Sequence, residues 1–253
     1  NLLTTMACSA SLVLDPDEGA EIKEVFGGLP VMDAGSGSKR VDLATLQFGQ
    51  TKDVVLRMSV KSKEAFLAAQ ASYTLPGGGK ETDFVEAKCP ASSTQVCLQH
   101  WRLQVAKTLE EAVAKASQGA EASCREAFDM LKSLSNEIRA AAAGQYENEQ
   151  FLKDLLTDLE GEATSAVEGP AAFTKWGRHY LPSLMFAHRR QMCNNFKDPG
   201  VQNYGGDMFQ DIQSHADDMF NQLPPPEPTN RRGSSVAYPA VRSMAAYNDA
   251  SAG

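Results

Sequence analysis

The sequence lacks both a long apolar run and a surplus of basic residues. No apolar run approaches the roughly 18 residues that a membrane-spanning helix needs. The 253 residues include 24 Lys and Arg against 32 Asp and Glu, which gives a net charge of -8. Because nucleic acids and anionic membranes attract basic surfaces, we expect no nucleic acid partner and no membrane insertion.

Cysteine is also scarce, with five residues spread thinly along the chain. An odd and scattered set does not make a disulfide framework and is typical of a reducing compartment, so we expect a cytoplasmic or otherwise intracellular protein. The sequence begins with Asn1 rather than Met and shows no signal-peptide pattern. We therefore expect a piece of a longer chain.

The first third of the chain shows the alternation of β-strands. The clearest strand is predicted over residues 53–60, where every second residue from Val54 to Val60 is apolar. Shorter β-like runs lie between turns rich in Gly, Pro, Ser and Asp, at 10–14, 22–26, 41–46, 66–74 and 84–87. The pattern predicts a small antiparallel β-sandwich over residues 1–90.

After residue 90 the apolar period changes from two to about 3.6, which predicts a helical domain over residues 91–222. Helices are expected at 94–117, from about Cys124 to Gly144, and around Leu152 to Leu159, joined as an antiparallel hairpin or bundle. Pro182 is expected to begin another helix, because proline fits a first helical turn. Residues 207–222 are expected to form the last helix. The fold class is therefore α+β.

Residues 223–253 form a low-complexity tail that begins with a proline-rich run, Pro224 to Pro228. Such a segment is expected to be extended unless it docks on another molecule. A plain linker and a polyproline ligand for a partner protein are both open readings.

No motif for catalysis or cofactor binding is complete. Residues 74–82 resemble a phosphate-binding loop, but Thr74 and Glu81 occupy the places of its first Gly and its Ser or Thr, so we expect a hairpin turn. The histidines His179, His188 and His215 do not have the spacing of a known zinc site with Cys193. We predict no cofactor, no metal and no enzymatic activity.

Two alternatives to this reading stay open. A hydrolase or transferase site would need His179, His188, Cys193 and Asp198 to converge on one pocket. An acidic stretch over residues 147–168 holds seven carboxylates and one lysine. We expect a solvated helix face there, with a docking surface for a basic partner as the alternative.

Two parts of the sequence resemble a known family. The first part combines residues 1–14 with residues 46–56. The second and more specific part runs from Trp176 to Leu184 and continues through Ala187 and His188 to residues 191–206. Both resemble the region after the A domain in eukaryotic von Willebrand A proteins of the Hint-associated, intein-like family.

The resemblance implies a β-sandwich that follows an upstream A domain, which would lie outside this chain. It implies no catalytic residue, because the A-domain metal site and the Hint nucleophile have no counterpart here. The residues of the shared module are expected to form either a binding surface or a common core: Trp176, His179, Tyr180, Leu181, Pro182, His188, Asn194, Asn195 and Asp198.

The sequence as a whole thus predicts a non-catalytic accessory region that binds a protein partner, with Trp101 or Trp176 as an exposed anchor. The alternatives are a structural subunit of a large assembly and, less favoured, the His/Cys hydrolase or a zinc site.

Overall fold

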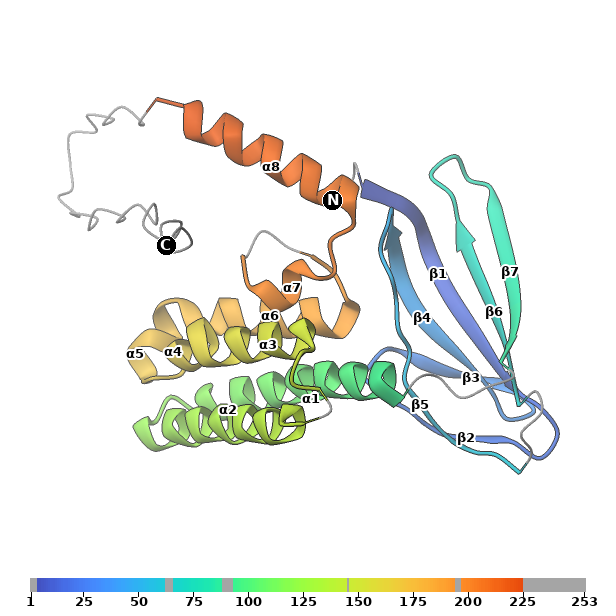
Figure 1. Cartoon of the computed structure of the whole chain (residues 1–253), viewed down its shortest axis with the longest axis horizontal. Coiled ribbons are helices and arrows are strands. Elements are labelled where there is room, and N and C mark those ends of the chain that lie inside the picture. Colours follow the sequence, from blue (N-terminus) through green and yellow to red (C-terminus); the bar gives the residue numbers. More distant parts are fainter. Residues whose placement is uncertain (1–3, 62–65, 88–92, 145, 194–196, 225–253) are drawn as a thin grey trace. The chain divides into compact units, whose positions relative to one another are not determined.

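A computed structural model describes residues 4–61, 66–87, 93–144, 146–193 and 197–224 (Figure 1). The chain divides into two compact units, Asn1–Ser214 and His215–Gly253. The first unit holds both sheets and the helices up to the start of the last one. Apart from Leu223 and Pro224, the tail predicted from the sequence lies outside the described residues.

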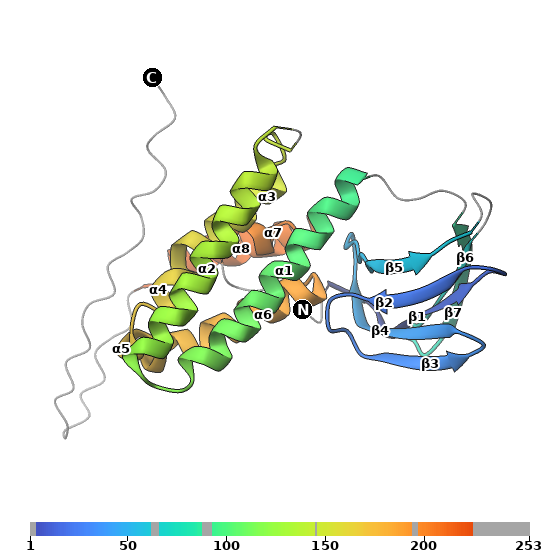
Figure 2. The ribbon, with the colours of Figure 1, turned by 90° about the horizontal axis from the view of Figure 1, so that it is seen from below.

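The α+β class predicted from the sequence is confirmed. Five strands form an antiparallel sheet in the order β3-β4-β1-β6-β7, and two more form a small sheet, β2-β5 (Figure 2). Their bounds are β1 Thr5–Pro16, β2 Glu21–Val25, β3 Val31–Gly35, β4 Ser38–Gln47, β5 Leu56–Ser59, β6 Leu67–Thr74 and β7 Lys80–Ala87.

Two strands differ from the prediction. β3 was missed because all five of its residues are exposed, so no apolar alternation marks it. The strand expected over 53–60 is only the short β5, which pairs with β2. At the start of this segment, the backbone of Asp53 is bonded to Gln191 and Arg102 instead of to a neighbouring strand. Val60 is 42% exposed rather than in the core.

The core of the β part lies between the two sheets. Four buried residues, one from each of β1, β2, β4 and β6, form its centre: Leu14, Ile22, Val41 and Leu67. The predicted apolar face of the β5 segment packs against them through Val54, Leu56 and Met58. Burying each large apolar side chain contributes about 1.5–3 kcal/mol, so this contact holds the small sheet on the larger one.

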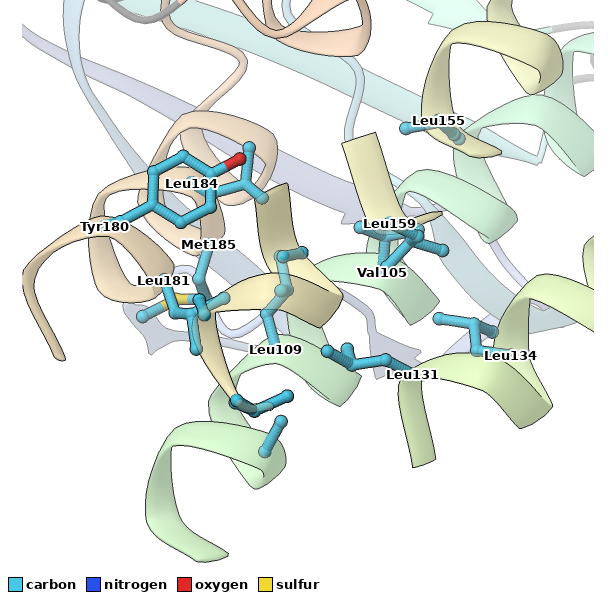
Figure 3. Packing of buried hydrophobic residues seen from close by; sticks show 14 of the residues in the cluster. Val105, Leu109, Leu131, Leu134, Leu155, Leu159, Tyr180, Leu181, Leu184 and Met185 are labelled. Carbon is cyan, nitrogen blue, oxygen red and sulfur yellow. The ribbon is translucent and has the colours of Figure 1, made fainter. Parts of the chain in front are cut away.

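The helical part begins at Ser93 and follows the predicted periodicity. Its elements are α1 Ser93–Ala116, α2 Glu121–Ala142, α3 Gln150–Asp158, the π-helical turn η2 Leu159–Ala163, α4 Thr164–Ala166, α5 Pro170–Ala172, the π-helical turn η3 Phe173–Gly177, α6 Arg178–Arg190, α7 Pro199–Gln202 and α8 Asp207–Gln222. Side chains from α1, α2, α3, η2 and α6 share one core (Figure 3).

Pro182 lies inside α6, so the prediction that it begins a helix was wrong. The helical path is continuous from Pro170 to Arg190, and Pro170 occupies the first turn instead. Pro182 has no N–H to donate to the preceding turn. The π-helical turn η3 ends shortly before it, and such turns commonly accompany an altered helical ladder.

Gly177, at the end of η3, permits a close approach to α4. A Cβ at this position would overlap the carbonyl oxygen of Ala166. We therefore predict that Gly177→Ala lowers the free energy of unfolding by about 1–3 kcal/mol, because overpacking forces the helices apart. Urea denaturation measures this loss. Gly77→Ala is the matched control, because nothing lies within 4 Å of a Cβ there; equal losses in both variants would contradict the prediction.

Candidate functional site

The C-terminal end of α6 meets a buried arginine from α1. Arg102 is 1% exposed. Its Nη1 donates to the carbonyl oxygen of His188 at 2.7 Å, its Nη2 to the carbonyl oxygen of Asp53 at 3.1 Å, and its Nε to Oε1 of Gln99 at 2.5 Å. Burial lowers the pKa of the guanidinium, and Tyr204 and Asp53 oppose this shift. The partial negative charge at the helix end stabilises the cation.

Two further carbonyl groups of this helix end are bonded from the segment between β4 and β5. Lys52 Nζ donates to the carbonyl oxygen of Arg190, and Gln50 Nε2 donates to that of Gln191. The last carbonyls of a helix have no partner within the helix, so these side chains satisfy them. Burial, and then the positive charges of Arg190 and Arg102, lower the pKa of Lys52 to about 8.

Gln191 ends α6 and completes the junction. Its backbone is left-handed, with φ at 46°, which stops the helix. Its side chain accepts from the backbone N–H of Asp53 at 2.6 Å and donates to Oδ2 of the same residue at 2.7 Å. We refer to Gln50, Lys52, Asp53, Arg102 and Gln191 as the clasp.

A second polar group lies in the interior beside the clasp. His188 is completely buried, with Nδ1 2.9 Å from the hydroxyl oxygen of Tyr204 and Nε2 at an ion-pair distance of 3.3 Å from Oδ2 of Asp158. Oδ1 of Asp158 accepts from the backbone N–H of Gly200 at 3.0 Å. A Cβ on Gly200 would overlap the Asp158 carboxylate, so only glycine fits. We call Asp158, His188, Gly200 and Tyr204 the buried polar cluster.

The surroundings shift two acidic groups of this cluster in the same direction. Burial raises the pKa of Asp158, opposed by the contacts with His188 and the Gly200 N–H. Burial also raises the pKa of Tyr204 well above its ordinary value, so its hydroxyl is neutral at physiological pH. A neutral hydroxyl can donate to or accept from His188. The cluster therefore joins α3, α6 and α7 through internal partners.

The predicted module residues are divided between core and surface. Tyr180 is buried and donates to the Asp198 carboxylate, with the Trp176 ring packed 5.4 Å away. Leu181 is fully buried. Pro182 is half-buried, and His179 is exposed and accepts from Arg178. Asn194 and Asn195 lie outside the described residues. Trp101 and Trp176 both pack against the helical core, so neither is the exposed anchor that was expected.

The four residues of the enzymatic alternative make their described contacts with different partners. Cys193 is buried and its Sγ donates to Oε1 of Gln202 at 3.5 Å, whereas His188 contacts the buried polar cluster. Asp198 contacts Tyr180 and His179 contacts Arg178. A cavity of about 280 Å³ borders the clasp, and its lining includes Asp53, Gln191 and Tyr204 but none of these four.

Within residues 4–224, the gaps excepted, no group of three or more His, Cys, Asp and Glu side chains is arranged to hold a metal ion. Nor does any helix in this part of the chain have the length and apolar character needed to cross a membrane.

Sequence reasoning missed the residues that organise this region. Arg102 lies on the apolar stripe of α1, between Leu98 and Val105, and a basic residue at such a position is a signal that its charge is satisfied inside. Asp158 carries a similar signal, since it directly precedes the buried Leu159. Nothing in the sequence indicates that Gln191 contacts Asp53.

Comparison with known proteins relates part of the chain to the family suggested by its residues. A family model described as VWA / Hh protein intein-like matches residues 149–218, which include the module from Trp176 to Asp198. This segment is therefore related to von Willebrand A proteins. The eukaryotic origin and the absence of the A domain stay predictions.

One similar solved structure is "von Willebrand factor type A from Catenulispora acidiphila". It is 13% identical, with a TM-score of 0.31, and the match covers 61% of this chain and 40% of that one. The chain thus spans less than half the length of that protein. No curated protein matches the sequence.

We predict that Asp158→Ala lowers the free energy of unfolding by about 3–5 kcal/mol, because it leaves His188 and the Gly200 N–H without their buried partner. Asp158→Asn keeps an acceptor for the Gly200 N–H and should lower the free energy of unfolding clearly less than Asp158→Ala does. Chemical denaturation of both variants tests this. Equal costs for the two variants would show that the carboxylate contacts contribute little.

We predict that raising the pH from about 7 to about 9.5 stabilises the wild-type protein relative to Lys52→Met. Near pH 7, Lys52 is protonated in both states, and its partly desolvated charge disfavours the folded state. Above a pKa of about 8 the folded-state amine loses its proton, whereas the unfolded-state lysine keeps it up to its ordinary value of 10.5. The cost therefore declines as the pH rises.

Urea denaturation of the two proteins at a series of pH values measures this effect. The difference between their free energies of unfolding should change little near pH 7 and change clearly above about pH 8. A difference that does not vary with pH would mean that Lys52 is not desolvated at the clasp.

Proposed function

We propose that this chain is a non-catalytic protein-interaction region and that it presents α8 to a protein partner. In this proposal the chain is an accessory part of a longer von Willebrand A-type protein in a reducing compartment, as its sequence resemblance and scarce cysteines suggest. The family match over residues 149–218 supports the proposal, because it includes most of α8 and A-type domains generally mediate protein interactions.

The exposed apolar stripe of α8 is the observation that carries the proposal. Helical spacing places six apolar side chains along one side of the helix and its C-terminal end: Met208, Phe209, Ile212, Met219, Phe220 and Leu223. Phe209 and Ile212 are half-buried, whereas Met219, Phe220 and Leu223 are 70%, 77% and 61% exposed. No residue of α8 is buried. A contiguous set of exposed large apolar side chains is typical of a binding surface.

The charge of α8 indicates what kind of partner fits it. The helix carries four aspartates and no lysine or arginine: Asp207, Asp211, Asp217 and Asp218. An amphipathic helix of this kind binds with its apolar face in an apolar groove. We therefore expect a protein whose groove has a basic rim, since positive charges there would complement the aspartates.

Within the clasp, the side chain of Gln191 bonds to Asp53, and within the buried polar cluster His188 lies 2.9 Å from the Tyr204 hydroxyl and Asp158 accepts from the Gly200 N–H. This arrangement favours a structural role for His188 and its neighbours over a catalytic one.

We predict that replacing Met219 and Phe220 together by serine weakens partner binding by more than about tenfold, because it removes two large apolar side chains from the stripe. The full chain serves as bait in a quantitative pull-down from cells of the source. Partners retained by the wild-type chain should be lost from the variant, whose circular dichroism and melting temperature should be unchanged.

The matched control is the double variant Gln210→Ser and Asn221→Ser, which changes two residues on the opposite side of α8. It should keep the partners of the wild-type chain. Equal retention by both double variants would contradict the proposal. Light scattering of the purified chain tests the alternative that the stripe binds a second copy of the chain. A dimer that is lost when Met219 and Phe220 are changed would assign the stripe to this self-association.

A further inference from the structure

β7 is an edge strand that is long, regular and paired on one side. It is paired with β6 along all eight of its residues, without a register shift. The other edge of the sheet, β3, has five residues and an irregular register. Among the described residues, β6 is the only neighbour of β7 in the sheet. Edge strands of this kind expose backbone groups that another strand can pair with.

The hairpin between β6 and β7 determines which backbone groups of β7 face outward. The backbone N–H of Leu75 donates to the carbonyl oxygen of Gly79, and the N–H of Gly78 donates to that of Leu75, each at 2.8 Å. Leu75 and Gly79 are therefore a hydrogen-bonded position of the ladder. Such positions alternate along an antiparallel pair.

Counting from Gly79, every second residue of β7 directs its backbone to β6, beginning with Glu81 and including Asp83 and Val85. The residues between them direct their N–H and C=O groups away from β6. These outward residues are Lys80, Thr82, Phe84 and Glu86. A new strand would form its ladder with Lys80, Thr82 and Phe84.

Two exposed apolar side chains lie in the middle of β7. Phe84 is 62% exposed and Val85 is 64% exposed. Val85 pairs with Ala69, which packs against the core between the two sheets. Val85 therefore lies on the same face of the sheet as this core but is itself exposed. Phe84 lies on the opposite face, because successive side chains of a strand alternate. An added strand would therefore find an exposed apolar side chain on either face of the sheet, Val85 on one and Phe84 on the other.

The charge on β7 distinguishes between partners. Glu81 and Asp83 share the face of Val85, and Lys80 is the one basic residue of the strand. A second copy of β7 would bring carboxylates next to carboxylates, which destabilises a strand pair. Basic side chains at alternate positions of an incoming strand would instead form favourable cross-strand pairs. Charged residues on an edge strand discourage pairing with unrelated strands. Glu81 and Asp83 therefore exclude acidic strands and attract basic ones.

We propose that β7 is a second binding site, at which an extended segment of another protein with alternating apolar and basic residues adds a sixth strand to the sheet. This mode of recognition uses backbone hydrogen bonds for affinity and alternate side chains for specificity. The site is separate from α8, so it stands or fails independently of the function proposed for that helix.

The test uses the full chain and two synthetic eight-residue peptides, matched to the length of β7. One alternates valine with lysine, and the other alternates valine with glutamate. Isothermal titration calorimetry should show binding of the lysine peptide and at least about tenfold weaker binding of the glutamate peptide. Amide hydrogen exchange should show new protection at Thr82 and Phe84.

Thr82→Pro removes one outward N–H and leaves the ladder with β6 intact, because proline is tolerated on the free side of an edge strand. It should weaken binding of the lysine peptide about tenfold. Thr82→Val is the matched control, since it keeps the N–H and should bind as the wild type does. The double variant Glu81→Lys and Asp83→Lys should reverse the preference between the two peptides.

Three results would overturn the proposal: equal affinity for both peptides, full binding by the Thr82→Pro variant, or protection confined to residues outside β7. A β7-dependent dimer of the chain without peptide binding would also overturn it, because the edge would then accept its own copy. None of these results depends on α8. The Met219 and Phe220 variant should bind the lysine peptide as the wild type does, which separates the two proposals.

Discussion

The end of α6 leaves carbonyl groups that the helix itself cannot satisfy, and side chains from α1 and from the segment after β4 bond to them. Arg102, Lys52 and Gln50 bond the carbonyl oxygens of His188, Arg190 and Gln191 in turn. A buried arginine is costly unless its donors are used. Here the helix end supplies both acceptors and partial negative charge. One constraint therefore fixes α1, α6 and the segment after β4 against one another.

The buried polar cluster also pairs polar groups in the interior, here within the helical core. His188 contributes its backbone to the clasp and its side chain to Asp158 and Tyr204. Gly200 completes the cluster because its backbone N–H approaches Asp158 where a side chain would not fit. Paired polar groups of this kind require specific partners, which favours one arrangement of the packed helices over others. His188, one of the four residues of the enzymatic alternative, thus has polar partners inside the helical core.

Two elements at the surface, α8 and β7, expose large apolar side chains. α8 exposes Met219 and Phe220 beside aspartates, and β7 exposes Phe84 and Val85 beside Glu81 and Asp83. Both surfaces combine apolar side chains with negative charge, in line with the net charge of -8. They suit different partners, because one offers a helix to a groove and the other offers backbone groups to a strand. A satisfied interior with two exposed elements agrees with the proposed role as an interaction region.

The sequence by itself determined the α+β class, the apolar stripes of α1 and α2, and the extent of α8, because these follow from periodicity along a short stretch of chain. It missed β3, whose residues are all exposed, and misplaced Pro182, because the first helical turn belongs to Pro170. Only the tertiary structure brought Gln191 to Asp53, 138 residues away, and placed Arg102 at the end of α6. The local sequence pattern indicates which face of an element is apolar. The partner of a buried polar group depends instead on which distant segments come into contact in the folded chain.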